Sequence, residues 1–170
     1  RREHHITADI AYAVYKYYAV TGDELFMSRY GYELFAATAR FWVSRASYQP
    51  RKKRYEIHHV MGPDEFHIDV NNNTYTSVLA QWNITTALLL WEGLKKKKKL
   101  YMKLCRKLGL RDAEFRQWKK VSQHMYTGRR KGKLIEQFEG YFSLRRITFN
   151  KIDENGLPLI PRRVHAGGLA

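Results

Sequence analysis

The chain has 170 residues, of which 44% are hydrophobic and 14% are aromatic, enough for one domain with a buried core. No apolar run approaches the roughly 20 residues of a membrane-spanning helix, and the first residues lack the apolar core of a signal peptide. We therefore expect no membrane partner. The one cysteine, Cys105, suits a reducing compartment, so we expect a cytoplasmic location.

The net charge of +15 is concentrated in the second half of the chain. Residues 1–90 carry 10 Lys and Arg against 9 Asp and Glu, a net charge of +1. Residues 91–170 carry 21 against 7, a net charge of +14. A positive field of this size can hold nucleic acid, anionic lipid or phosphate. An ordinary solvated surface is the simpler interpretation of charge patterning alone.

Apolar residues recur at helical spacing along residues 6–20 and 24–47, which predicts two helices. The sequence Thr21-Gly22-Asp23 separates them, because glycine ends the first helix and Asp23 or Thr21 can cap the second. Two helices joined by so short a turn are expected to pack antiparallel. Gly31 is the weak point of the second helix.

A basic loop at residues 48–54 contains Pro50, and residues 55–60 favour an extended strand that forms half of a small hairpin. Residues 74–94 predict a third, long helix. Its Leu88-Leu89-Leu90-Trp91 run indicates that much of the helix circumference is buried.

Five adjacent lysines, Lys95–Lys99, would repel one another along a helix. We therefore expect an exposed helix end or a break between helices at this point. Two shorter helices are predicted after it, at residues 101–108, ended by Gly109, and at residues 112–125, capped by Asp112.

The last part of the chain gives weaker signals. Residues 126–133 are basic and contain glycine, and the aromatic residues 134–142 do not favour one structure. Residues 153–158 predict a turn, with an irregular end beyond them. The fold class is all-α with minor β, and both a helical barrel and a bundle fit it. Because the chain begins without methionine and closes on no element, we expect one domain, residues 1–170, truncated at both ends.

The motif Met61–His67 lies between the predicted strand and the long helix. Gly62-Pro63 interrupts regular structure, and the asparagines at 71–73 favour a turn. Asp64, Glu65 and His67 are therefore expected on a connection between ordered elements. Catalytic groups concentrate on such connections.

Asp64 and Glu65 are neighbours, so their side chains should diverge rather than share one proton. Either carboxyl could be a lone general acid if a poorly solvated aromatic pocket raised its pKa. The alternative is that Asp64 caps a turn and Glu65 is a surface charge. The histidines show no metal-ligand spacing, and we expect no metal. Candidate aromatic residues for the pocket are Phe66, Tyr75, Trp82, Trp42 and Tyr141.

Four separated motifs resemble glycoside hydrolase family 65, which includes maltose, trehalose, kojibiose and nigerose phosphorylases and acid trehalases. The resemblance runs in order across nearly all 170 residues. It implies the central part of an (α/α)6-barrel catalytic domain that is incomplete at both ends. The motifs are Glu3–Ala13, Tyr17–Asp23, Gly62–His67 with Asn72–Thr76, and Glu136–Phe142.

The resemblance implies inverting phosphorolysis, in which an α-linked glucosyl disaccharide and phosphate give β-glucose 1-phosphate and a free sugar. In the family, the glutamate of the Gly-Pro-Asp-Glu motif is the general acid, and here it is Glu65. Inverting hydrolysis needs a second carboxylate to deprotonate water. Phosphate is already an anionic nucleophile, so one acid is enough. Phosphate would be the co-substrate, and no cofactor is implied.

Other residues of these motifs are candidates for substrate binding. Asp64 and His67 flank the acid, and a role in the turn is their alternative. Capping of the first helix is the alternative for Asp9, and core packing is the alternative for Tyr75. The full set of candidates is Asp64, His67, Asn73, Tyr75, His5, Asp9 and Glu139.

Two features depart from the family pattern. Ser77 follows Tyr75-Thr76 where the family often has asparagine, which weakens the case for normal activity if that asparagine positions something. The lysine run is unusual but falls in a surface linker. The resemblance places the phosphate-binding loops beyond Ala170 and the acceptor-selecting segment around or before Arg1. The chain alone is therefore expected to be inactive.

Two other functions remain open. An acid-trehalase-like inverting hydrolase would not need phosphate, although Gly62 and His67 resemble the phosphorylase branch. A non-catalytic nucleic-acid-binding module would use the basic clusters Lys95–Lys99, Arg129–Lys131 and Arg145-Arg146, and its affinity would fall with salt. No helix-turn-helix signature or stacking platform accompanies them. Nucleic acid is therefore not the expected partner.

Family members are often dimers, so the resemblance implies a homodimer for the full-length protein. The sequence names neither the disaccharide and its linkage nor the oligomeric state.

Overall fold

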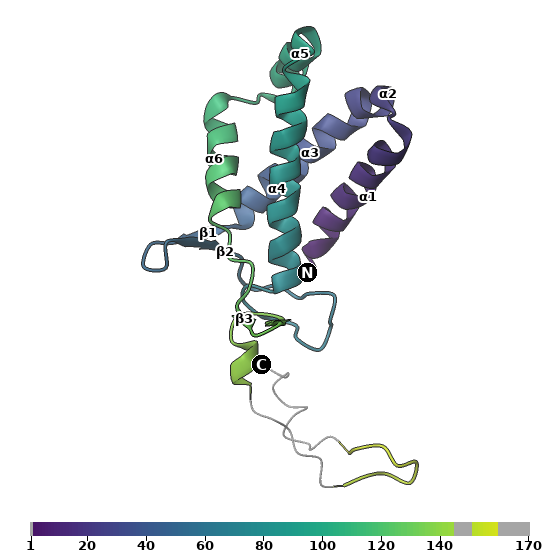
Figure 1. The fold of residues 1–170 in the computed structure, drawn as a ribbon, viewed down its shortest axis with the longest axis vertical. Helices are drawn as coiled ribbons and strands as arrows, with labels where there is room; N and C mark the ends of the chain where they lie inside the picture. The colour runs from purple at the N-terminus through teal and green to yellow at the C-terminus, as the bar shows by residue number, and fades with distance from the viewer. Residues whose placement is uncertain (1, 145–150, 160–170) are drawn as a thin grey trace.

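The long helix α4 (Thr74–Leu94) stands at the centre of the computed structural model, which describes residues 2–144 and 151–159 (Figure 1). Helices α1, α3 and α6 pack against it. Arg145 and Arg146 lie outside the described residues, as does almost all of the irregular end expected after residue 158.

Helix α1 (His5–Thr21) ends as its sequence predicts. Gly22 has a φ of 63°, in the left-handed region that favours glycine, and its N–H donates to the last turn of α1 at 2.8 Å. The next helix starts after Asp23, whose side chain accepts the Phe26 N–H at 2.8 Å. Asp23 rather than Thr21 is therefore the cap. Helices α1 and α3 contact each other and run in opposite directions (Figure 1).

The second helix contains a wide turn where Gly31 was predicted to weaken it. A π turn adds one residue to a helical turn and locally disturbs the packing of side chains. A Cβ on Gly31 would lie 2.2 Å from Met27 Sδ, so the close approach inside this turn requires glycine or a shifted Met27. The parts of this helix are α2 (Glu24–Phe26), the π turn η1 (Met27–Gly31) and α3 (Tyr32–Arg45).

A short hairpin follows α3. Strand β1 (Ser47–Gln49) pairs antiparallel with β2 (Arg54–Glu56). The predicted helix was therefore too long at its end, and the predicted strand at 55–60 was also too long. The strand stops because the Ile57 N–H and carbonyl bond to Asn72 instead of a neighbouring strand, at 2.9 and 2.7 Å.

Helix α4 has the predicted bounds, 74–94, and carries much of the core. Ile84, Ala87 and Trp91 are fully or almost fully buried. Val78 and Leu89 are 41% and 68% exposed, so the expectation of a largely buried circumference is only partly right. The helix therefore keeps exposed positions that its neighbours among the described residues do not cover.

The lysine run forms the predicted break between helices. Lys95–Lys97 make the connection, and helix α5 (Lys98–Leu108) begins three residues before the predicted 101. All five lysines are exposed, which lets them stay solvated. Gly109, with a φ of 62°, ends the helix as predicted.

Helix α6 (Asp112–Gln123) differs from its prediction at both ends. Asp112 is its first residue, and Arg111, which has no side-chain acceptor, precedes it, so the predicted cap is wrong. The helix ends before 125 because the chain turns to run beside β2. There the Tyr55 N–H donates to the His124 carbonyl at 2.8 Å and the Tyr126 N–H donates to the Tyr55 carbonyl at 2.9 Å.

The elements after α6 are short. The predicted turn at 153–158 is present, with the Gly156 N–H donating to the Asp153 carbonyl at 3.1 Å. The short elements are β3 (Arg130–Lys131), β4 (Leu134–Ile135) and the 3-10 turn η2 (Tyr141–Ser143).

The prediction of an all-α fold with minor β is confirmed. The beginnings of α1 and α4 and the ends of α3 and α6 lie at one end of the helices, where the hairpins and connections gather (Figure 1). No helix in the described part of the chain has the length and apolar composition to cross a membrane.

Replacement of a buried residue of α4 tests the importance of this core. Ile84 is 0% exposed and Leu89, on the same helix, is 68% exposed. We expect Ile84→Ala to lower the free energy of unfolding by about 2–5 kcal/mol through lost contacts and a cavity. The matched change Leu89→Ala should cost less than about 0.5 kcal/mol. Urea denaturation of the chain measures both, and equal losses would contradict the observed packing.

Candidate active site

The start of α4 brings together segments that are far apart in the sequence. The Thr74 N–H donates to the Gln137 carbonyl at 2.8 Å, and its hydroxyl donates to the Glu136 carbonyl at 2.6 Å. The Glu139 N–H donates to the Asn71 carbonyl at 3.2 Å. The Gly-Pro-Asp-Glu motif, the asparagine turn and the 136–142 motif therefore meet at the same end of the helices (Figure 1).

Two buried asparagines build this junction. The Asn73 side chain caps α4 and accepts the Thr76 N–H at 3.0 Å. Asn72 has a φ of 54°, a left-handed conformation that asparagine tolerates better than most residues. Its amide accepts from the Ile57 N–H at 2.9 Å and donates to Glu139 at 2.6 Å. Asn73 therefore starts the helix, and Asn72 joins it to the hairpin and to the 136–142 motif.

The motif loop is closed at its base by backbone hydrogen bonds. The Val60 N–H donates to the Val70 carbonyl at 3.0 Å, and the Val70 N–H donates to the Val60 carbonyl at 2.9 Å. His5 Nδ1 lies 3.2 Å from the Met61 carbonyl, which can only accept, so this nitrogen carries the proton. A Cβ on Gly62 would lie 2.3 Å from the Asn73 amide nitrogen, so glycine allows the loop to lie directly on the helix cap.

Asp64 is held by hydrogen bonds on both oxygens of its carboxylate. Oδ1 accepts the Phe66 N–H at 3.0 Å, and Oδ2 accepts from the Gln137 amide at 2.5 Å. The Gln137 bond, followed by the Phe66 bond, lowers the pKa of Asp64 below its ordinary value because both stabilise the charged form. Asp64 therefore remains ionised and spans Glu65 with a side-chain turn.

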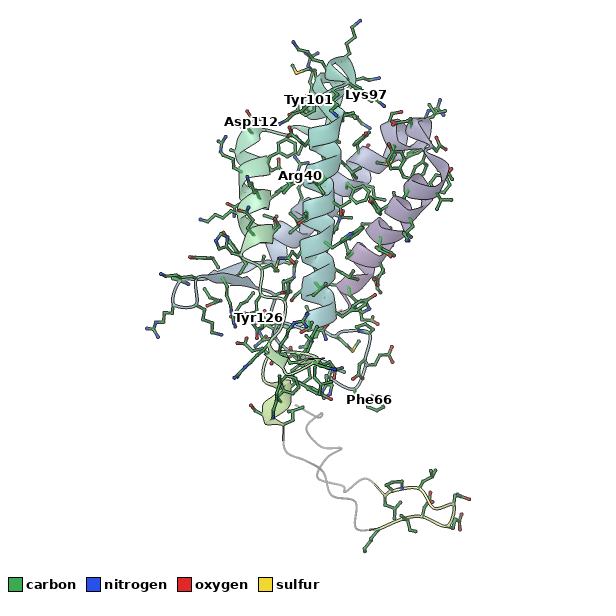
Figure 2. All side chains as sticks on the ribbon, viewed as in Figure 1. Arg40, Phe66, Lys97, Tyr101, Asp112 and Tyr126 are labelled. Atoms are coloured by element: carbon green, nitrogen blue, oxygen red, sulfur yellow. The ribbon has the colours of Figure 1, made fainter. Side chains whose placement is uncertain are left out.

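Glu65 is exposed and has no hydrogen bond or ion pair among the residues that the structure describes. The described residues do not form an aromatic pocket around it, so its surroundings match the alternative in which Asp64 caps a turn and Glu65 is exposed. Phe66 is 74% exposed, whereas Trp42 is buried in the helical core. The reason is that the loop extends away from the helices, as Phe66 shows in Figure 2.

His67 turns towards the 136–142 motif. Its ring centroid lies 4.7 Å from that of Phe138 and 6.4 Å from that of Tyr141. Phe138 is buried, at 5% exposure. The histidine therefore joins the loop to the same segment that Asp64 contacts.

Asp9, Tyr75 and His5 form a group between α1 and α4. The Tyr75 hydroxyl donates to Asp9 Oδ1 at 2.8 Å, and the Tyr75 ring lies edge-on to His5 at 5.9 Å. Capping of α1 was the alternative for Asp9, but no side chain caps α1 at His4. Tyr75 is 45% exposed, so the alternative of a core residue is also wrong.

A cavity of about 570 Å³ lies beside the cap of α4. It brings together the candidates Asp64, Asn73 and Tyr75, but the other candidate residues do not line it. Its lining is mostly apolar, so it offers few partners for sugar hydroxyls. The lining residues are Pro63, Asp64, Asn73, Thr74, Tyr75, Val78, Leu79, Ile135, Glu136 and Gln137.

Glu139 faces the basic side chains of the β1–β2 hairpin. It accepts from Lys52 at 3.1 Å and from Arg54 at 2.5 Å. Burial favours a higher pKa for Glu139, but the bonds from Lys52, Asn72 and Arg54 outweigh it and lower the pKa. This carboxylate therefore ties the junction to the hairpin.

Glu56 lies in the same network and was not singled out from the sequence. It is 3% exposed and accepts from Arg54, His58 and Lys52 at 2.7, 2.7 and 3.0 Å. Burial alone would raise its pKa, but the bonds from His58, Lys52 and Arg54 outweigh burial and lower the pKa to about 2. The arginine and the two histidines that lie close to Glu56 in the sequence could have indicated a paired carboxylate at this position.

Glu136 is a second buried carboxylate, 3% exposed, that sequence reasoning missed. It accepts from the Tyr126 hydroxyl and from the Arg129 N–H, the latter at 2.8 Å. Burial, followed by the hydrogen bond to Glu136, raises the pKa of Tyr126 to about 12. This pair fixes the backbone from which Gln137 reaches the loop.

Ser77 lies in the second turn of α4 and is fully buried. Its hydroxyl has no hydrogen-bond partner within the described ranges 2–144 and 151–159. For metals, the described residues contain no group of three His, Cys, Asp or Glu side chains that could hold an ion.

Sequence comparison identifies relatives of the chain. A family model, "Glycosyl hydrolase family 65 central catalytic domain", matches residues 1–165. A kojibiose phosphorylase from Thermoanaerobacter brockii is 49% identical over 164 residues, covering 95% of this chain and 21% of the relative. A 1,2-alpha-glucosylglycerol phosphorylase from Bacillus selenitireducens is 42% identical over 144 residues, covering 84% and 19%. The chain spans about a fifth of the length of these relatives.

Structural comparison agrees. A solved structure named "Putative kojibiose phosphorylase from human microbiome" superposes with a TM-score of 0.75 and 28% identity, over 89% of this chain and 20% of that chain. This likeness supports the expected fold class, an incomplete (α/α)6 barrel.

The Glu56 network predicts a dependence of stability on acid pH. The pKa of Glu56 falls from 4.5 to about 2 on folding, so its stabilising contribution is complete above pH 4.5 and is lost as pH falls towards 2. The loss is about 3 kcal/mol, since each pKa unit is worth ~1.4 kcal/mol. We expect Glu56→Gln to flatten the stability profile in this range. Denaturation curves from pH 6 to pH 2 test it, and parallel profiles for the two proteins would contradict it.

The contact of Gly62 with the helix cap predicts a coupled pair of substitutions. Gly62→Ala should push the Asn73 amide away from Thr76 and lower the free energy of unfolding by about 1–2 kcal/mol. Asn73→Ala alone should cost about 1 kcal/mol. The double variant should lose less than the sum, because the collision disappears with the amide. Chemical denaturation of the four proteins measures this coupling, and simple additivity would refute it.

Proposed function

The chain belongs to glycosyl hydrolase family 65, and we propose on this basis that the longer protein is an inverting phosphorylase of an α-glucosyl disaccharide. Its substrates would be the disaccharide and inorganic phosphate. Its products would be β-glucose 1-phosphate and a free sugar. Residues 1–170 would be one incomplete catalytic domain of that protein, inactive alone.

The different surroundings of two adjacent carboxyl groups support Glu65 as the general acid. Both oxygens of Asp64 accept N–H donors, which holds that group in its charged form. Glu65 is exposed and makes no hydrogen bond or ion pair to the rest of the described chain. A proton donor must reach the substrate, and of the two carboxyls only that of Glu65 is uncommitted to partners in the described chain and can turn towards it.

In the proposed step, a phosphate oxygen attacks the anomeric carbon from the face opposite the leaving group. The bond from this carbon to the glycosidic oxygen breaks, and its electron pair stays on that oxygen. The oxygen takes the proton of the Glu65 carboxyl and leaves as a sugar hydroxyl. The glucosyl group keeps the phosphate with inverted configuration, and the Glu65 carboxylate regains a proton from solvent.

One carboxyl group suffices for this chemistry. Inverting hydrolysis needs a base to deprotonate water on the far side of the sugar. Phosphate carries its own negative charge and needs only to be positioned. The proposed reaction therefore uses the asymmetry between Asp64 and Glu65 without a second catalytic carboxylate.

The other motif residues would orient the substrate and the loop. Tyr75 and Asp9 form a hydrogen-bonded pair that is in part exposed and could meet a sugar hydroxyl. His5 would hold the loop through its bond to the Met61 carbonyl and would pack against the Tyr75 ring. Asn73 would act through the α4 cap, and His67 through its contact with Phe138.

Kojibiose is the first substrate to test. A kojibiose phosphorylase is 49% identical to this chain, and a second relative is named for a 1,2-alpha-glucosyl compound. An α-1,2-linked glucoside is therefore the proposed substrate class. A homodimer and a cytoplasmic location remain predictions.

Binding of nucleic acid is not favoured by the position of the lysines. Lys97 lies at the end of α4 opposite Phe66 (Figure 2), and this 21-residue helix is about 30 Å long. Lys95 and Lys97 also pair with Glu92 and Glu24, at 2.6 and 2.9 Å. These exposed pairs reduce the charge available to a phosphate backbone.

Glu65→Gln tests the proposed acid in the full-length protein. The amide keeps the shape of the side chain but has no carboxyl proton, so phosphorolysis of kojibiose should fall about 10²- to 10⁴-fold. Release of glucose 1-phosphate, followed with and without phosphate, measures it. Maltose, trehalose and nigerose in parallel assays identify the linkage.

The control is Glu33→Gln, which removes an exposed carboxylate that pairs with Lys107 at 2.6 Å, away from the loop. It should leave the rate unchanged. Glucose released without phosphate would indicate a hydrolase instead. Full activity of Glu65→Gln would remove Glu65 from the proposed role.

A further inference from the structure

Gln137 connects the acid-bearing loop to the start of α4. Its side-chain amide Nε2 donates to Asp64 Oδ2 at 2.5 Å, and its main-chain carbonyl accepts the Thr74 N–H at 2.8 Å. Its side chain is half-buried beside the cavity at the helix cap. Gln137 lies within the Glu136–Phe142 motif, and the sequence indicates no role for it.

We propose that Gln137 is a positioning residue for the acid, acting on Glu65 through the Asp64 carboxylate. This inference rests on the proposed function, since it assumes that Glu65 donates the proton. It assigns Gln137 no direct contact with the substrate.

The geometry supports this role because Asp64 spans Glu65 on both sides. Asp64 precedes the acid in the chain, and its Oδ1 accepts the N–H of Phe66, which follows the acid, at 3.0 Å. The direction of the Glu65 side chain is therefore set by the turn that Asp64 closes. An exposed side chain without further partners depends on its backbone for direction, and Gln137 holds the carboxylate that shapes this backbone.

The segment that carries Gln137 is itself firmly held. Glu136 accepts from the Arg129 N–H and the Tyr126 hydroxyl, and the Thr74 hydroxyl donates to the Glu136 carbonyl at 2.6 Å. Phe138, on the other side, is 5% exposed and packs against His67. Gln137 therefore projects from a buried backbone and gives the loop a fixed reference point.

A neutral amide suits this task. Its N–H donor keeps Asp64 ionised without adding a positive charge near the acid. A lysine or arginine at position 137 would also donate, but its charge would favour the ionised form of a nearby glutamic acid and remove the proton that the reaction needs.

The first test is Gln137→Leu in the full-length protein, assayed for phosphorolysis of kojibiose. Loss of the bond should misdirect the acid and lower kcat about 10²-fold, while the KM for phosphate changes less than about threefold, because ground-state binding is not removed. The matched control is Gln81→Leu, whose amide donates to the Ser122 carbonyl at 2.8 Å between α4 and α6. It should keep the wild-type kcat.

The second test is Gln137→Glu, whose readout is the pH dependence of activity. A variant that is only less stable would not show the dependence expected here. At neutral pH the carboxylate of Gln137→Glu would face the Asp64 carboxylate and repel it. As pH falls, the two groups share one proton, which restores a donor to Asp64. The activity of this variant relative to wild type should therefore rise as pH falls.

Other titratable groups lie near this pair. His67 is on the same loop, and Glu136 is next to Gln137 in the chain but bonds to Tyr126. Both are present in wild type and in Gln137→Leu. The pH profile of Gln137→Leu therefore corrects for their titration.

The outcomes separate this inference from the proposed function. If Glu65→Gln is inactive but Gln137→Leu keeps the wild-type kcat, the positioning role is wrong and the proposed function stands. The same holds if Gln137→Glu shows no recovery at low pH. If Glu65→Gln keeps its activity, Glu65 is not the acid and this inference falls with that assignment, whatever the Gln137 variants do. A fall in kcat for Gln137→Leu, together with recovery of Gln137→Glu, supports the inference.

Discussion

The hydrogen bonds of the Asn72 and Asn73 side-chain amides hold together the end of the molecule where α4 begins. Asn73 caps α4 and lies against Gly62, and Asn72 satisfies the buried Ile57 N–H while it donates to Glu139. Buried polar groups are costly when unpaired. These two side chains pair the groups left over where the helix, the hairpin and the 136–142 motif meet. The motif loop is positioned because it is anchored to this junction.

Around the junction, carboxyl groups take different roles because the hydrogen-bond donors that face them differ. Asp64 receives two N–H groups, whereas Glu65 receives none from the described chain. Glu56 and Glu139 are charged for a different reason, since Lys52 and Arg54 lie between them. The ionisation of Asp64, Glu56 and Glu139 follows from the donors placed around each carboxylate. Residue type alone would not distinguish these carboxyls.

The distribution of charge follows the architecture. The lysines after α4 stand at the far end of that helix from the loop, where water solvates them (Figure 2). Near the junction, Arg54 is matched by the carboxylates of Glu56 and Glu139. The lysine run is thus separated in space from the proposed chemistry.

The sequence by itself determined the features that depend on neighbouring residues. The bounds of α4, the stop at Gly22 and the break at the lysines follow from local backbone and charge effects, and the quoted motifs carried the family resemblance. The tertiary structure alone decided the partners of Asp9 and Asp64, because Tyr75 and Gln137 lie 66 and 73 residues away. It also decided where β2 ends, since Asn72 competes for the backbone of Ile57. Contacts of this range depend on which segments pack together, and no local pattern encodes that.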